Sequence, residues 1–528
     1  MMLYTTADVP FSFDFTAING LASGAEGEGE GEGEGGAGGV LGSVLDLHLD
    51  VKNHMFAGEA LVLALLAASL GSAAAGCAQA AGAAGDSWTL VPAPLKLPWN
   101  PLMTDDEVRR GTQYGSGNGL ARVAQKLLAK QPIKVVVLGG SVSDGGSLDN
   151  TGTSYTARLF SFINQTYPHA DHKFINQAMP GANSGWYAPC VRTYVGNGAD
   201  LVLVDFTVND KATAEITSQE RRSYEQLLRR LLRLPQQPAV VLLHHYAWMT
   251  AVGDGKRQGL YYGGPEMVFR ELAQYYDLPS LSLRGAAWRQ MQAGLTGFRV
   301  DKVARPQGVK VMAGFRAAAE PATWRNYVYR DTVQPGATGH QLLAELACAA
   351  LIRALWEAES TLVVTRRADP RVTSLPPPMI PNEYDTSEYC RVQGAAQGAM
   401  VYQTGFIFRE DRPEQKEQLD KHLGWTGYKT GATLTLKVDT RSGISGDSGP
   451  ASVAVMHQRG RGQGSAVVTC AGGCKCAPAK LNSNTSNPAL AFSKVELTTT
   501  QASRCLVKVT ITSTGLKKLH IGGVWVNH

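Results

Sequence analysis

The sequence predicts an α/β domain followed by an all-β domain, and three observations support this. The chain has 528 residues, more than a single hydrophobic core usually organises, so two folded domains are expected. From about residue 92 to 359, apolar runs alternate with amphipathic helical stretches, the pattern of βαβ units and a parallel sheet. Beyond residue 385, short alternating strands separated by Gly, Ser and Asn are typical of a β-sandwich.

The first 84 residues are expected to lie outside both domains. Residues 1–54 contain a Gly/Glu repeat that cannot bury a core, which predicts disorder. Residues 55–84 hold the apolar run Leu61–Leu70 followed by small residues, the shape of a secretory signal peptide. This run is shorter than the roughly 20 apolar residues of a membrane span. We therefore expect a secreted protein without a stable span in its mature form; the alternative is a membrane anchor through residues 60–80.

The α/β domain is assigned to residues 85–359. Its first strand, from Lys134, has Val and Leu without polar alternation, so both faces should be covered, as in a three-layer α/β/α sheet. Ligands in such folds gather at the carboxyl ends of strands. Further strands are expected at 174–176, 201–206, 239–243 and 278–283, and helices at 223–234, 266–276 and 337–357.

Residues 360–385, with prolines at 376–378, are expected to be a linker, and 386–528 the β-sandwich. Residues 360–528 hold 20 Lys+Arg against 12 Asp+Glu, which indicates a solvated basic surface; binding of an acidic polymer is the alternative. The whole chain has a formal charge of +5 without long basic runs, so no nucleic-acid partner is expected. Sandwich strands are expected at 432–438, 452–456, 466–469, 494–497, 506–511 and 521–526.

Five of the eight cysteines lie in the last third of the chain, which favours disulfides and an oxidising compartment. Because five is odd, one thiol is free or pairs outside this segment, where Cys190 could be its partner; Cys348 is expected to be buried. Zinc sites use C-x₂₋₄-C pairs with a distant second pair, which this segment lacks, so no metal or cofactor is expected. The five are Cys390, Cys470, Cys474, Cys476 and Cys505.

Ser141 follows the first strand, in a Gly-Gly-Ser turn. Glycines here allow tight backbone geometry and close approach of a substrate to the serine N–H, so the turn suits a nucleophile. The alternative is an ordinary βα loop. Three further strand-end sites occur in the order that acyl transfer would need, and they contain Gly181, Asn209 and Asp331.

Together these four sites, over roughly residues 130–358, resemble the motif blocks of the SGNH (GDSL) hydrolases. The resemblance implies Ser141 as nucleophile, with oxyanion donors from the N–H groups of Ser141 and Gly181 and from the Asn209 amide. It also implies that Asp331 orients a catalytic base. Asp210 is expected to cap a helix or orient its loop.

The chain departs from this family at the base. The last block normally reads Asp-x-x-His-Pro, whereas this chain has Gln334, which cannot accept a proton near neutral pH. His340 is the candidate substitute base, and His244 and His245 end a strand at the same rim. Gly140 also stands where the family has Asp, and Thr207 where it has Gly.

The functional hypothesis is a secreted SGNH-type serine esterase that hydrolyses an ester, such as an O-acyl group on a polysaccharide, with the β-sandwich helping to hold the substrate. The alternative is a catalytically impaired carbohydrate-binding protein, because Gln334 replaces the base. A third hypothesis makes the β-sandwich a glycan-binding or adhesion module on an α/β scaffold.

Overall fold

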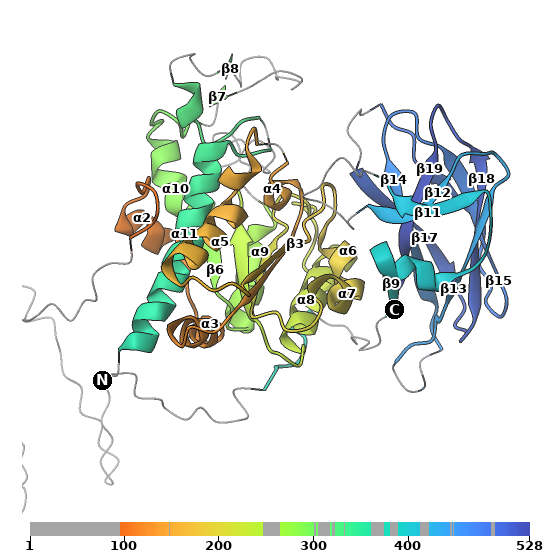
Figure 1. Ribbon diagram of the computed structural model, residues 1–528, viewed down its shortest axis with the longest axis horizontal. Coiled ribbons are helices and arrows are strands. Elements are labelled where there is room, and N and C mark those ends of the chain that lie inside the picture. Colours follow the sequence, from red (N-terminus) through yellow and green to blue (C-terminus); the bar gives the residue numbers. More distant parts are fainter. Residues whose placement is uncertain are drawn as a thin grey trace, which may run out of the picture. The chain divides into compact units, whose positions relative to one another are not determined.

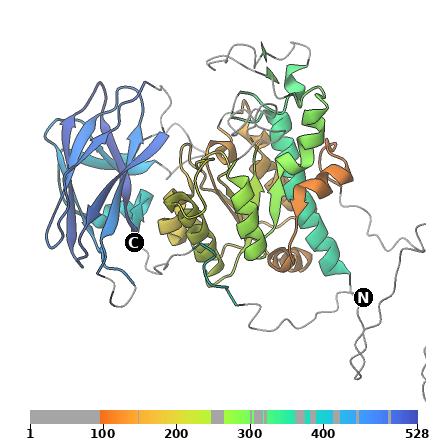
Figure 2. The same ribbon diagram turned by 180° about the vertical axis from the view of Figure 1, so that it is seen from behind.

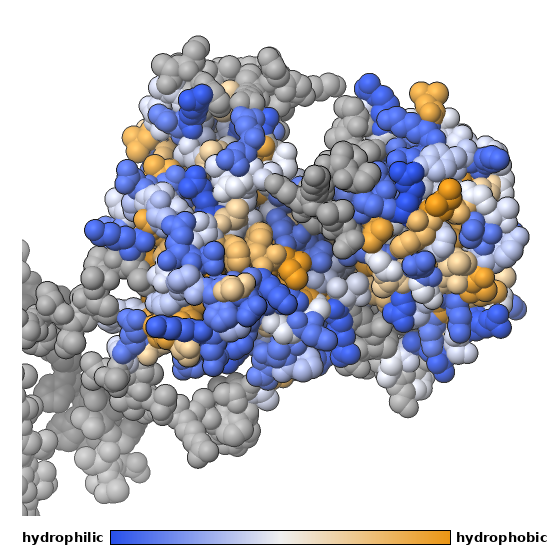
Figure 3. Space-filling model, viewed as in Figure 1, coloured by the Kyte–Doolittle hydropathy of each residue, from blue (hydrophilic) through white to orange (hydrophobic). Residues whose placement is uncertain are grey.

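The computed structural model describes residues 96–527, except 147, 247–263, 300–301, 305–316, 319–322, 332, 361–373, 381–388, 412–421, 444–445, 447 and 487–490. The expectations for residues 1–54 and 55–84 lie outside the described residues. Within the described part, no helix is long and apolar enough to cross a membrane. On the face shown in Figure 3, both the α/β part and the β-rich part present hydrophobic residues among hydrophilic ones.

The α/β part is built on one six-stranded sheet with the order β1-β6-β5-β4-β2-β3. The strands β2 to β6 are parallel to their neighbours, and the short edge strand β1 pairs antiparallel to β6. A mixed sheet therefore replaces the purely parallel one expected. The strands are β1 (Thr112–Gln113), β2 (Lys134–Gly139), β3 (Lys173–Asn176), β4 (Leu201–Asp205), β5 (Ala239–His244) and β6 (Ser280–Ser282).

Helices cover both faces of this sheet (Figures 1 and 2). Along β2, Val135 and Val137 pack in the core formed with α3 (Asn118–Leu128), α5 (Tyr155–Thr166) and α11 (Ala337–Glu359). Val136 and Leu138 point the other way, into the core formed with α8 (Gln219–Leu232) and α9 (Glu266–Tyr275). The unbroken apolar run of β2 follows from this double burial.

One expected strand ends early. Residues 278–283 were expected to form a strand, but β6 stops at Ser282, and Leu283 begins the helix α10 (Leu283–Gln292). The Ser282 side chain accepts the N–H of Gly285 and so caps this helix. The remaining helices of this part are α2 (Asp105–Gly111), α4 (Ser141–Asp144), α6 (Ser184–Tyr187) and α7 (Val191–Val195).

The β-rich part consists of two antiparallel sheets around a common apolar core. One has the order β10-β13-β18-β15-β16, and the other β11-β12-β19-β14-β17, with β9 paired to β19. Every strand expected in this region is present. The strands are β9 (Cys390–Val392), β10 (Met400–Thr404), β11 (Phe406–Glu410), β12 (Leu423–Gly427), β13 (Thr433–Val438), β14 (Ala451–Arg459), β15 (Ser465–Ala471), β16 (Ala479–Asn482), β17 (Ala491–Thr499), β18 (Cys505–Ser513) and β19 (Leu519–Asn527).

The expectation of disulfides is confirmed. Cys470 pairs with Cys476 and Cys474 with Cys505 inside the β-rich part, while the odd cysteine, Cys390, pairs with Cys190. Cys348 is a free, buried thiol on α11.

The β-rich part packs on the α/β part, and residues 91–528 form one compact unit. Besides the bridge to Cys190, Trp186 of α6 meets the rings of Trp525 and Phe492 at centroid distances of 4.9 and 6.1 Å. These aromatic residues belong to the same buried cluster as Val136 and Leu138 of β2. The sheet containing β14, β17 and β19 therefore turns its outer face to the α/β part.

Candidate active site

Ser141 lies at the carboxyl end of β2, where the strand turns directly into α4. Gly140 is the residue before the helix, with φ −101° and ψ −149°, and Ser141 is the first helical residue. The helix ends after one turn at Gly145, whose φ of 74° favours glycine. Ser141 is half-buried.

Gly140 explains how Asn209 comes to lie beside this turn. A Cβ atom at Gly140 would sit 2.0 Å from Oδ1 and 2.4 Å from Nδ2 of Asn209, so the Asn209 amide occupies that space. Asn209 follows β4 in a turn in which its own N–H and that of Asp210 both donate to the carbonyl of Phe206. Because residue 140 is glycine, the Asn209 amide can lie against the backbone next to Ser141.

Gly181 lies in the loop after β3, and this loop is fastened to the end of β2. The N–H of Met179 donates to the carbonyl of Gly139 at 3.0 Å, and the Tyr187 hydroxyl lies 3.0 Å from the same carbonyl. Gly181 itself has φ +85°, a conformation that favours glycine. On its outer side, a Cβ would be 3.4 Å from that of Ala491 in β17.

Gln334 reaches Ser141 from a tight turn before α11. The Oδ1 atom of Asp331 accepts the N–H groups of Val333 and Gln334, both at 2.8 Å, which fixes the turn. The Nε2 atom of Gln334 then donates to Oγ of Ser141 at 2.7 Å. Its buried Oε1 atom has no hydrogen-bond partner among the described residues.

Within the described part of the chain, no histidine side chain is hydrogen-bonded to Ser141. His340 is buried in the first turn of α11, where its Nδ1 accepts the N–H of Tyr155 at 3.2 Å; its Nε2 has no hydrogen-bond partner in the described part of the chain. His244 bonds to Ser280 through Nε2. Burial lowers the pKa of His340 and of His244 to about 3, so both are neutral near pH 7.

His245 has a role that the sequence did not suggest. Its Nε2 donates to the carbonyl of Val333 at 2.9 Å, which ties the Asp331–Gln334 turn to the end of β5. Its own carbonyl accepts the hydroxyl of Thr207 at 2.6 Å, so the loop after β4 is joined to the same point. Burial lowers the pKa of His245 to about 4, which keeps the ring neutral.

Two buried carboxyl groups accept hydrogen bonds from serines near the candidate site. Asp205 ends β4 and accepts the Ser143 hydroxyl at 3.0 Å, and the Tyr155 hydroxyl lies 2.7 Å from the same Ser143 oxygen. Asp210 accepts both the N–H and the hydroxyl of Ser184 at the start of α6, at 2.8 and 2.6 Å. Burial raises the pKa of Asp205 and of Asp210 to about 6. No sequence pattern pointed to the network of Ser143, Tyr155 and Asp205.

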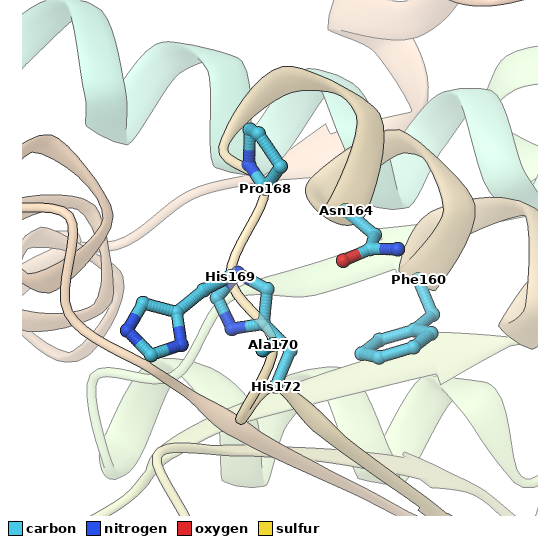
Figure 4. A pocket seen from close by; sticks show the side chains of 6 residues that line it. All are labelled: Phe160, Asn164, Pro168, His169, Ala170 and His172. Atoms are coloured by element: carbon cyan, nitrogen blue, oxygen red, sulfur yellow. The ribbon is translucent and has the colours of Figure 1, made fainter.

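A surface hollow of about 420 Å³ lies elsewhere (Figure 4). Its lining comes from α5 and from the loop that leads into the amino end of β3, whereas Ser141 lies at the carboxyl end of β2. Within the described part of the chain, no group of three or more His, Cys, Asp or Glu side chains is placed to hold a metal ion. The lining residues are Phe160, Asn164, Pro168, His169, Ala170 and His172.

The sequence matches no protein-family model and no curated protein. The structure resembles a crystal structure of a two-domain esterase (CEX) active on acetylated mannans, with a TM-score of 0.56, 20% identity, and coverage of 79% of this chain and 97% of that chain. The same esterase co-crystallised with mannopentaose gives a TM-score of 0.55 and 19% identity over the same shares. The two chains thus share a fold across both the α/β part and the β-rich part.

Proposed function

We propose that this chain is an extracellular SGNH-type serine esterase that acts on O-acyl groups of a polysaccharide. The observation that carries this is the position of Ser141: half-buried, first residue of α4, at the carboxyl end of β2, with Asn209 against Gly140 beside it. The shared two-part fold supports a polysaccharide ester as substrate, because the esterase it resembles is active on acetylated mannans.

In the proposed reaction, Oγ of Ser141 attacks the ester carbonyl carbon and the carbonyl oxygen takes the negative charge. The N–H groups of Ser141 and Gly181 and the Asn209 amide are the donors for that oxygen, each worth about 2.7–4 kcal/mol in such sites. The sugar oxygen leaves with a proton, and water then releases the acyl group from Ser141 as a carboxylic acid.

The proton of the Ser141 hydroxyl has no efficient acceptor. The neighbour at 2.7 Å is the Gln334 amide, and an amide is not a base near neutral pH in either orientation. Loss of a general base typically costs 10²–10⁴-fold in rate. We therefore infer slow turnover that depends on Ser141.

The Gln334 contact also supports the second candidate, a binding protein that retains the pocket without catalysis. In that case the donors around Ser141 would hold an acyl oxygen of the glycan and no bond would break. The two candidates predict the same ligand and differ in whether acetate is released.

Acetate release from acetylated mannan and hydrolysis of p-nitrophenyl acetate by the purified protein separate them, with Ser141→Ala as the control. The esterase proposal expects slow release that Ser141→Ala abolishes. Equal background rates for wild type and Ser141→Ala, together with retained binding to acetylated but not deacetylated mannan, would establish the binding protein. Neither release nor binding would overturn both.

A further inference from the structure

The sheet β10-β13-β18-β15-β16 has an outward face of unusual composition. Along β13, Leu434, Leu436 and Val438 are buried in the common core, while Thr435 and Lys437 alternate with them and point outward. The strand β18 repeats this pattern, with Lys508 exposed between the buried Val507 and Val509. Most outward residues of this sheet are polar, as expected for a half-buried strand, but the half-buried Leu506 on β18 and Val467 on β15 also lie on this face.

The charges on this face are all positive. The five strands contain no Asp or Glu, and they contain three exposed lysines, Lys437, Lys480 and Lys508. Within the described part of the chain, none of the three forms an ion pair. The nearby acid Asp439 follows β13, and Arg441 already neutralises it at 2.6 Å.

Strand register places the three lysines on one diagonal line. Lys437 pairs with Leu506, two residues before Lys508 on β18. Lys480 pairs with Val467, which lies opposite Thr510, two residues after Lys508. From ordinary strand spacing and rise, the Cα atoms are about 8 Å apart between the first two lysines and about 12 Å between Lys508 and Lys480.

Hydroxyl groups lie beside these charges, and one exposed aromatic ring lies on the edge strand β10. A single row across the sheet runs from Tyr402 on β10 through Thr435 and Lys508 to Thr469 on β15. Tyr402 is 60% exposed, and its hydroxyl accepts that of Thr404 at 2.9 Å. We call Tyr402, Thr435, Thr469 and the three lysines the lysine–threonine face.

This face is separate from the surface that meets the α/β part. Met456, Phe492 and Trp525, on the outer face of the other sheet, are buried with residues of the α/β part. The residues of the lysine–threonine face are exposed or half-buried. A ligand on it would leave Ser141 unobstructed.

We propose that the lysine–threonine face binds an extended anionic polysaccharide, a chain of sugars that carries carboxylate or sulfate groups. Lysine ammonium groups are compact point charges suited to such anions. Threonine and tyrosine hydroxyls can exchange hydrogen bonds with sugar hydroxyls, and the Tyr402 ring offers one apolar platform. A single-stranded nucleic acid would call for a series of stacking aromatics, whereas Tyr402 offers a single ring. A membrane would call for a continuous apolar surface, whereas the apolar Leu506 and Val467 of this face are half-buried and lie beside lysines. The proposal does not depend on the esterase function.

The test measures binding of the full-length Ser141→Ala protein to polygalacturonate, with the fully methyl-esterified polymer as an uncharged match on the same backbone. Sulfated dextran forms the second arm and neutral mannan the third. The triple variant Lys437→Glu/Lys480→Glu/Lys508→Glu removes the charged line. The matched control, Lys96→Glu/Lys130→Glu/Lys173→Glu, makes the same change in net charge at exposed lysines of the α/β part.

We expect the face variant to bind the anionic polymer on the order of ten- to a hundredfold more weakly, and the control variant to bind it nearly as wild type. Binding of the anionic polymer should weaken in high salt. Tyr402→Ala alone should also weaken this binding relative to wild type. A preference for polygalacturonate assigns carboxylates, and a preference for sulfated dextran assigns sulfates. Equal losses in both triple variants, equal binding of the methyl-esterified polymer, or a preference for RNA or anionic vesicles would overturn the proposal.

Discussion

Gln334→His tests the proposed reaction at the step that lacks a residue, the removal of the proton from the Ser141 hydroxyl. In the wild type, Gln334 places an amide nitrogen 2.7 Å from Oγ of Ser141. An imidazole at this position would present a basic nitrogen to the same hydroxyl. Asp331 lies three residues earlier, and its bonds to the backbone of the turn use Oδ1, so Oδ2 can accept the other imidazole N–H.

The expected gain follows from what a general base supplies. Restoring proton transfer should raise the rate of ester hydrolysis by about 10²–10⁴-fold, equivalent to about 2.7–5.5 kcal/mol in activation free energy. The rate should rise with pH through the pKa of the new imidazole, near 6.5 if its surroundings leave it unshifted. Wild type should lack that ionisation, because an amide does not titrate.

Hydrolysis of p-nitrophenyl acetate, followed over pH, measures the gain. Gln334→Leu removes the hydrogen bond without adding a base and should remain slow, and Ser141→Ala in the Gln334→His background should abolish the gain. Asp331→Asn in that background keeps the Oδ1 acceptor of the turn but not the carboxylate, so most of the gain should disappear. If a folded Gln334→His is no faster than Gln334→Leu, our assignment of position 334 is refuted. Efficient wild-type hydrolysis that is lost in His340→Ala or His245→Ala would also refute it.

Three further outcomes are expected. Gly140→Ala should lower Ser141-dependent hydrolysis, because the added Cβ would lie 2.0 Å from Oδ1 of Asn209; unchanged activity would argue against the Asn209 amide as a donor. Non-reducing peptide mapping should find Cys190 joined to Cys390, and replacing both by Ser should cost about 2–5 kcal/mol of stability in urea denaturation, whereas equal midpoints would contradict this. The free energy of unfolding should fall as the pH drops below about 6.5, because four buried histidines stay neutral in the folded protein and take up protons when it unfolds. Each such proton changes the free energy of unfolding by about 1.4 kcal/mol per pH unit. Below about pH 6 this slope should roughly halve. Two buried carboxyl groups with raised pKa are then protonated in the folded state, and these two protons cancel those of two of the four histidines. A free energy of unfolding that stays constant from pH 7 to 5 would contradict this. The groups are His244 and His340 with pKa about 3, His245 and His457 with pKa about 4, and Asp205 and Asp210 with pKa about 6.

The strongly periodic elements of the fold could be predicted from the sequence, and the short ones could not. The buried run of β2 and the long helix α11 carry enough apolar residues to identify them by pattern alone. The two-residue strand β1 has no periodicity, and its pairing with β6 depends on tertiary contacts. The sequence predicts a strand through Leu283 because this residue continues an apolar run, yet the side chain of Ser282 caps a helix that begins at Leu283.

At the candidate site, residue types could be predicted but their partners could not. The sequence singled out Ser141 and Gln334 as a pair, and the structure adds the 2.7 Å bond between their side chains. His340 is the candidate substitute base from the sequence because it lies six residues after Gln334. The bond from His340 to the backbone of Tyr155 depends on the packing of α11 against α5, which no local pattern encodes.

In the proposed reaction, positions 140 and 334 affect different steps. At Gly140, the missing side chain leaves room for Asn209 beside the serine turn, which favours stabilisation of negative charge on a substrate oxygen. At position 334, the amide nitrogen donates to Oγ of Ser141, so the proposed reaction has no efficient acceptor there for the serine proton. A site with this combination should bind an acyl ester about as well as a complete one, because its donors are retained, while proton removal limits the chemical step. The deficit should therefore appear in kcat with little change in KM, and Gln334→His should raise kcat at nearly constant KM.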